Sequence, residues 1–187
     1  DLPKNRIGLS KWLFDKKNPL TSRVAVNRYW QMIFGRGIVN TPGDFGVQGS
    51  LPSHPKLLDF LSNYLVENNW DIKDLIRLML NSHTYMQSST PNQKYTEIDP
   101  DNIFLSRSNS YRLPAEMIRD NALAASGLMV KNVGGKSVRP YQPKGLWREK
   151  SNFSLKLMNY KESLGDSLYR RSMYTFIRRT SPPPSMS

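Results

Sequence analysis

One helical run carries the polar side chains whose types and spacing best suit ligand binding. Arg23, Asn27 and Gln31 lie four residues apart, so they share one face of the predicted helix, and Arg28 flanks them. Their guanidinium and amide groups could hold a carboxylate, sulfate or phosphate, because arginine offers paired donors. The same groups could instead be buried and hold the following loop in place, through Asp44. The aromatic residues beside them favour this structural role, and the anion site is the alternative.

Two histidines and one pair of carboxylates are available for acid–base chemistry. His54, at the start of a predicted helix, could act as a general base, but a histidine there more often caps or packs. His83 continues an apolar helix face, which favours a core position. Glu116 and Asp120 lie four residues apart, as an acid–base pair could, yet the intervening Arg119 favours a solvated face. No Ser-His-Asp arrangement or phosphate-binding loop stands out, so we expect no catalytic residue.

Basic and aromatic residues alternate near the end of the chain. The candidate ligand-binding residues there are Tyr169, Arg170, Arg171 and Arg178. Arginines interleaved with aromatic rings suit stacking on nucleic-acid bases or on sugar rings that carry anionic groups. An equally good interpretation is a basic surface that docks onto a downstream segment.

The composition narrows the chemistry further. The 187 residues include two histidines and no cysteine, which excludes disulfides, thiolate metal sites and covalent c-type haem, so we expect no metal and no cofactor. The net charge of +12 predicts attraction to polyanions such as acidic polysaccharide or nucleic acid. Solubility, or an acidic neighbouring domain, would explain the charge equally well. No apolar run approaches the roughly 20 residues that span a bilayer.

Apolar periodicity predicts a mainly α-helical fold. The expected helices cover residues 5–15, 22–34, 54–67, 71–83, 114–129 and 166–179, although the last run also alternates as a strand would. The helices on either side of the turn at residues 68–70 should form an antiparallel αα-hairpin. Between 114 and 129, apolar residues at alternating spacings of three and four predict a close-packed seam. The run SPPPSMS at the end should adopt polyproline II.

These elements combine into one expected architecture. Residues 38–53 and 133–147 are rich in glycine and proline and should form long loops. We therefore expect a multi-helix domain over residues 1–187, with an αα-hairpin and long Gly/Pro-rich loops.

Several stretches together resemble a known family. They read NPLTSRVAVNRYWQMIFGRGIVNTPGDFGVQGSLPSHPKLLDFL, NNWDIKDLIRLMLNSHTYMQSS, YRLPAEMIRDNALAASGLM, GGKSVRPYQPKGLW and YRRSMYTFIRRTSPPPSM. The combination resembles the DUF1553 family, also called PSD1, over nearly the whole chain. That family continues beyond PPPSMS with further Arg, Thr-Pro and Leu-rich motifs, so we expect a fragment that lacks the C-terminal part of the domain.

The resemblance implies a setting more than a reaction. Family members are mainly large exported proteins of planctomycetes and related bacteria, which commonly carry a c-type cytochrome module and a DUF1549 domain. The resemblance therefore implies that the protein is located in the periplasm or cell envelope. We expect a non-catalytic interaction or scaffold module that packs against these domains and binds acidic polysaccharide. The alternatives are part of a composite active site for polysaccharide or redox chemistry, completed by neighbouring domains, and, ranked last, nucleic-acid binding through the basic surface.

Overall fold

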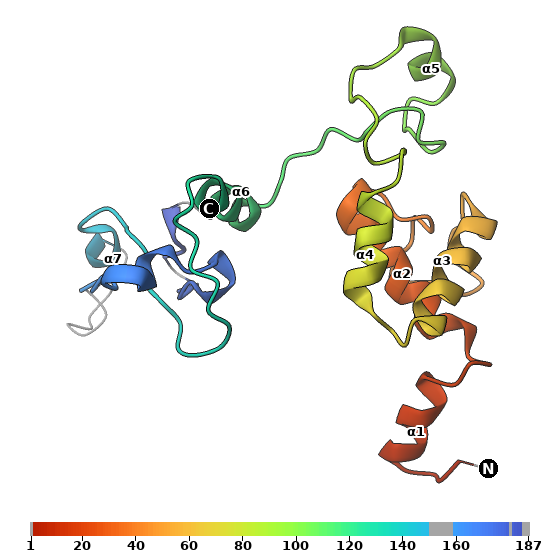
Figure 1. The fold of residues 1–187 in the computed structure, drawn as a ribbon, viewed down its shortest axis with the longest axis horizontal. Helices are drawn as coiled ribbons and strands as arrows, with labels where there is room; N and C mark the ends of the chain where they lie inside the picture. Colours follow the sequence, from red (N-terminus) through yellow and green to blue (C-terminus); the bar gives the residue numbers. More distant parts are fainter. Residues whose placement is uncertain (1, 150–158, 180, 185–187) are drawn as a thin grey trace. The chain divides into compact units, whose positions relative to one another are not determined.

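The chain is mainly α-helical, as its periodicity predicts, and forms two compact units. The computed structural model describes residues 2–149, 159–179 and 181–184. The first unit is Asp1–Tyr111 and the second is Arg112–Ser187 (Figure 1). Within these described ranges, no helix is both long enough and apolar enough to cross a membrane.

Asparagine and aspartate side chains begin most helices of the first unit. These helices are α1 (Arg6–Leu13), α2 (Pro19–Phe34), α3 (Pro55–Glu67), α4 (Ile72–Leu80) and α5 (Gln93–Ile98). Asn5, Asn18, Asp71 and Asn92 each accept a hydrogen bond from a first-turn N–H of α1, α2, α4 and α5 respectively, which satisfies a donor without a helical partner. α2 therefore begins at a proline, earlier than its apolar periodicity predicts.

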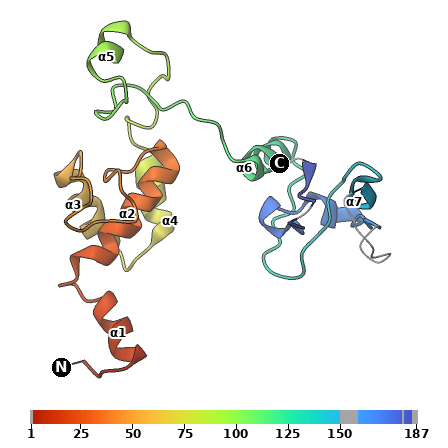
Figure 2. The same ribbon diagram turned by 180° about the vertical axis from the view of Figure 1, so that it is seen from behind.

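The hydrophobic core of the first unit lies among α2, α3 and α4. α2 buries Val26, Trp30 and Phe34, which recur every four residues on one face. Their partners on the other two helices are Leu58, Leu61, Leu65, Leu75 and Met79. α2 lies between α3 and α4 when the molecule is seen from either side (Figure 1, Figure 2). The chain reverses between α3 and α4, which confirms the predicted αα-hairpin.

α1 stands apart from this core. It extends away from the α2–α4 bundle in both views (Figure 1, Figure 2). The ring of Phe14, just after α1, meets the edge of Trp70 with 4.9 Å between ring centroids. Most apolar side chains of α1 remain exposed, so the predicted amphipathic helix forms without burying its apolar face.

Two side chains from the end of the first unit close the C-terminus of α2. The amide of Asn109 donates to the C=O of Phe34, and the hydroxyl of Tyr111 donates to the C=O groups of Met32 and Ile33. Carbonyls in the last turn of a helix have no partner within the helix. The segment after α5 therefore completes a helix that precedes it by more than 70 residues.

A tight loop after α5 is built around Asp99. This buried carboxylate accepts hydrogen bonds from the N–H groups of Ile103 at 2.8 Å and Phe104 at 2.7 Å. Burial raises the pKa of Asp99, but these two bonds and the charges of Arg107 and Arg36 outweigh it, so the pKa lies below its ordinary value. The folded loop therefore favours the ionised carboxylate.

Acid should destabilise this loop through Asp99. A carboxyl whose pKa is lower in the folded state stabilises the fold above its unfolded pKa of about 4, and this contribution is lost as the pH falls through the folded value. We expect the free energy of unfolding to fall more steeply in the wild type than in Asp99→Asn as urea titrations move from about pH 5 to 2. Asp101→Asn, at an exposed neighbouring carboxylate, is the control and should follow the wild type. Equal slopes for all three proteins would contradict the assignment.

The second unit has less regular structure. Its elements are α6 (Ala115–Ala125), α7 (Leu146–Glu149) and the 3₁₀ helices η1 (Gly165–Tyr169) and η2 (Ser172–Tyr174). Isolated parallel bridges join Val130 to Arg170 and Val138 to Thr175. The predicted helix over 166–179 is wrong, because these bridges alternate with short 3₁₀ turns and interrupt helical hydrogen bonding.

The apolar seam predicted between 114 and 129 is also wrong. None of the α6 residues is buried, and Ile118 is 50% exposed. α6 packs against η2 instead through two polar side chains, those of Arg119 and Asp120. The predicted polyproline II run extends into residues 185–187, which lie outside the described residues.

Candidate functional site

Asn27 of the predicted polar stripe is a buried structural residue. Its Nδ2 donates to the C=O of Val39 at 3.0 Å, and its Oδ1 accepts from the N–H of Val39 at 2.8 Å. The side chain has no exposed surface. Gly37 lies against this pair, because a Cβ at that position would come within 2.5 Å of the Val39 oxygen. Asn27 therefore holds the beginning of the 38–53 loop on α2 and is closed to a ligand.

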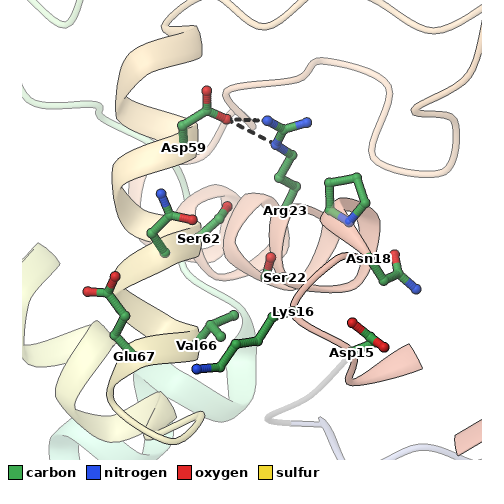
Figure 3. Close-up of a pocket in the computed structure, with 11 residues that line it drawn as sticks. Asp15, Lys16, Asn18, Ser22, Arg23, Asp59, Ser62, Val66 and Glu67 are labelled. Atoms are coloured by element: carbon green, nitrogen blue, oxygen red, sulfur yellow. Dashed lines mark hydrogen bonds and ion pairs between the residues drawn. The ribbon is translucent and has the colours of Figure 1, made fainter. Parts of the chain in front are cut away.

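Arg23 faces a different partner. Its Nε and Nη2 donate to Oδ1 of Asp59 on α3 at 3.0 and 2.6 Å (Figure 3). Both side chains are more than a third exposed, so this ion pair contributes at most about 1 kcal/mol to stability. Arg28 is exposed and Gln31 half-buried, and no described residue bonds either side chain. The structure thus does not bring the four residues of the stripe to one site.

Arg23 and Asp59 form the rim of a polar cleft between α2 and α3. The cleft has a volume of about 350 Å³, and the two helices and the turn before α2 enclose it (Figure 3). The lining residues are Asp15, Lys16, Asn18, Pro19, Ser22, Arg23, Asp59, Ser62, Asn63, Val66 and Glu67. Cavities of this size are at the lower end of those that hold small ligands.

Asp44 and His54 each interact within their own segment. The Asp44 carboxylate accepts from the N–H of Gly46 at 2.7 Å and closes a turn of its loop rather than pairing with an arginine. His54 occupies the N-cap of α3 without a capping hydrogen bond, and its Nδ1 lies 2.9 Å from Oγ of Ser53. The predicted core position of His83 is wrong, because its side chain is exposed after α4 ends.

Arg170 lies inside the second unit rather than on its surface. Its guanidinium donates to the C=O groups of Asn132, Gly134 and Lys136. It also stacks over the ring of Tyr174, 3.8 Å from the centroid. The side chain is 8% exposed, so it organises the 132–136 loop and has no surface for a polyanion.

The other candidates near the C-terminus lie in separate surroundings. Tyr169 is 36% exposed. Nε of Arg171 lies 3.6 Å from a carboxylate oxygen of Asp120. The guanidinium of Arg178 lies over the ring of Trp147, 5.1 Å from its centroid. The predicted basic–aromatic cluster is therefore divided between internal contacts and does not form one binding surface.

Trp147 is the centre of a small aromatic core in the second unit. Tyr160 and Phe176 contact its ring with centroids 5.1 and 5.9 Å away, and Arg139 lies over it at 5.7 Å. Burial raises the pKa of Tyr160 to about 12. The negative charge of Glu162 adds to this rise, and the positive charge of Arg139 partly offsets it. Because Trp147 is only 5% exposed, its ring cannot serve as a stacking platform for a sugar or a base.

Sequence reasoning missed Arg119 and Asp120 as organising residues. Arg119 donates to the C=O groups of Leu168 and Arg170, both at 2.9 Å, and Asp120 accepts from the N–H of Ser172 at 2.7 Å. The predicted solvated face is therefore a docking face within the unit. No local spacing could reveal it, because the partners lie about 50 residues away and are mostly backbone groups.

The described residues contain no cluster of three or more His, Asp or Glu side chains that could hold a metal ion. No curated protein and no solved structure shows significant similarity to the chain. The model of one family, PSD1, matches residues 5–187 and is described as "Protein of unknown function (DUF1553)". This match covers nearly the whole sequence, so the chain belongs to the PSD1 (DUF1553) family.

Proposed function

We propose that the chain is a non-catalytic interaction module of a larger exported protein, in which α1 docks onto an acidic surface of a neighbouring domain. The observation that carries this proposal is the exposed apolar face of α1 among basic side chains. The family resemblance adds a c-type cytochrome module as one candidate neighbour, and the periplasm or cell envelope as the location.

The polar residues best suited to chemistry are already engaged within the chain. Asn27 and Arg170 bond backbone groups, Arg23 bonds Asp59, and Asp120 bonds the backbone of η2. Polar groups that already bond one another inside a fold have no donors or acceptors left to bind and activate a substrate, as a catalytic site requires. This pattern supports an interaction role over catalysis.

The apolar side chains of α1 show the opposite pattern. Leu9, Trp12 and Leu13 follow the spacing i, i+3, i+4 and so share one face, and they are 56%, 51% and 37% exposed. Ile7 is 63% exposed on the same helix. Exposed apolar side chains that share a helix face and are rimmed by polar residues commonly mark an interaction site.

The charge around α1 indicates the chemistry of its partner. Between residues 4 and 17 the exposed charged residues are five bases and one acid, namely Lys4, Arg6, Lys11, Lys16, Lys17 and Asp15. A complementary surface needs apolar groups at its centre and carboxylates at its rim. A protein domain offers both, whereas acidic polysaccharide offers charge and hydroxyl groups but few aliphatic ones. The structure of α1 therefore favours a protein partner over the polysaccharide.

Brief trypsin digestion of the full-length protein tests the proposal, because trypsin cuts after Lys16 and Lys17, in the turn that follows α1, only while this turn is accessible. We expect slow cleavage after Lys16 and Lys17 in the wild type. Leu9→Asp places a charge on the docking face and should speed that cleavage about ten-fold or more. Val47→Asp is the matched control, because Val47 is a fully exposed apolar residue outside α1.

Three outcomes would overturn the proposal. Rapid cleavage in the wild type would show that α1 is uncovered in the full-length protein. Equal acceleration by Leu9→Asp and Val47→Asp would show a general loss of structure. Protection that appears only after dextran sulfate or duplex DNA is added would assign α1 to an acidic polymer instead of a domain.

A further inference from the structure

We infer that the cleft between α2 and α3 binds a small neutral polyhydroxyl ligand, such as a single sugar residue. This inference does not depend on the proposed docking of α1, because its central residues, Ser22 and Asn63, lie on α2 and α3.

Two helices direct polar stripes into this cleft. α3 contributes Asp59, Ser62, Asn63, Val66 and Glu67, which follow the spacing i, i+3, i+4, i+7, i+8 of a single helix face. α2 contributes Pro19, Ser22 and Arg23 from its first two turns (Figure 3). Neighbouring helices normally place apolar residues on the faces that meet. Here the facing stripes are polar and enclose an open volume.

Ser22 provides the most specific signal. Its side chain lines the cleft although the residue is only 6% exposed, and no group among the described residues bonds its hydroxyl. Ser62, on the opposite wall, donates its own hydroxyl proton to the C=O of Leu58 at 2.6 Å. The Ser22 hydroxyl therefore faces the cleft with its hydrogen-bonding capacity unused by the protein, so a ligand in the cleft can bond it.

Further polar groups around Ser22 are available to a ligand. The side-chain amide of Asn63 offers two N–H donors and a carbonyl acceptor. Lys16 offers an ammonium donor, and Glu67 offers a carboxylate acceptor. None of these three side chains bonds another residue in the described part of the chain. Hydroxyl groups both donate and accept, so a polyol can satisfy this mixed set.

The charge of the cleft disfavours an anionic ligand. Its lining has three carboxylates, on Asp15, Asp59 and Glu67, and two cations, on Lys16 and Arg23, so the net charge is 2 − 3 = −1. The whole chain, by contrast, is strongly basic, with a net charge of +12. No aromatic side chain is among the residues that line the cleft, so a nucleobase would find no stacking partner. A neutral, hydroxyl-rich ligand fits both facts.

Three sugars that differ in charge at similar size test this inference. We would titrate the 187-residue chain with D-glucose, D-glucuronate and D-glucosamine and follow backbone amide shifts by NMR. We expect saturable shifts with glucose that centre on Ser22 and Asn63, and binding of glucuronate weaker by about ten-fold, because the carboxylate adds a negative charge to a cleft of the same sign.

Variants of single side chains locate the site. Ser22→Ala and Asn63→Ala should each weaken glucose binding about five-fold, which corresponds to one lost hydrogen bond. Asn63 is exposed and bonds no described residue, so its variant should keep wild-type stability even where Ser22→Ala does not. Asn81→Ala, an exposed asparagine outside the cleft, is the matched control and should bind like the wild type.

The inference fails in any of three cases. The first is that glucuronate binds as tightly as glucose, the second is that glucosamine is the only one of the three sugars that binds, and the third is that none of the three causes saturable shifts. The second case would identify an amine site, and the third an unoccupied surface cleft. A loss of α1 docking would change none of these outcomes, so the two proposals can fail separately.

Discussion

Replacing Arg170 with alanine is expected to lower the free energy of unfolding of the second unit by about 3–5 kcal/mol. The variant leaves the C=O groups of Asn132, Gly134 and Lys136 without their donor, and Tyr174 loses the cation that stacks on its ring. Amide hydrogen exchange measures this change in the second unit alone. Protection of the backbone at residues 130–138 and 170–175 should fall together.

Two further variants make this result specific. Arg171→Ala removes the adjacent arginine, whose side chain is half exposed, and should cost no more than about 0.5 kcal/mol. Arg170→Lys retains the charge, but a single ammonium cannot match the planar fork that reaches three carbonyls, so it should recover only part of the loss. If Arg170→Ala and Arg171→Ala have equal effects, the carbonyls around Arg170 do not depend on its side chain.

Asn27→Ala is expected to destabilise the first unit by about 2–4 kcal/mol. The substitution leaves both the N–H and the C=O of Val39 buried without a partner, in a position that water does not reach. Urea unfolding followed by fluorescence measures it, because the buried Trp30 lies one turn away on the same helix.

Arg28→Ala provides the matched control for Asn27→Ala. Arg28 is the next residue of α2, is exposed and bonds no described side chain, so its loss should change stability by less than about 0.5 kcal/mol. If Asn27→Ala is as stable as this control, Asn27 does not have the structural role assigned to it, and its amide is again a candidate ligand group.

The helices of the first unit could be predicted because their signals are local. Asp71 caps α4 through the N–H of Asp74, three residues away, and Pro55 opens α3 at the position where its missing N–H has no cost. The apolar repeats of α3 and α4 then predict the hairpin. Each of these signals lies within one or two turns of the residues that it organises.

The candidate sites depended on partners that sequence spacing does not identify. The tie from Asn27 to Val39 was anticipated only in outline, as a link to the following loop. Arg170 and Arg119 bond backbone carbonyls about 35 and 50 residues away, and a carbonyl has no sequence signature. The cleft was missed because its walls come from two helices, and neither polar stripe alone differs from a solvated face.

The closure of α2 by Asn109 and Tyr111 has a consequence for the order in which the first unit folds. α2 and α3 can meet early, because they are consecutive along the chain and the loop between Phe34 and Pro55 is far shorter than the segment that leads to Asn109. The last turn of α2 must wait for a segment more than 70 residues downstream, and closing so long a loop costs more entropy. That turn is therefore the last part of α2 to become stable as the chain folds, and the first to open when it unfolds.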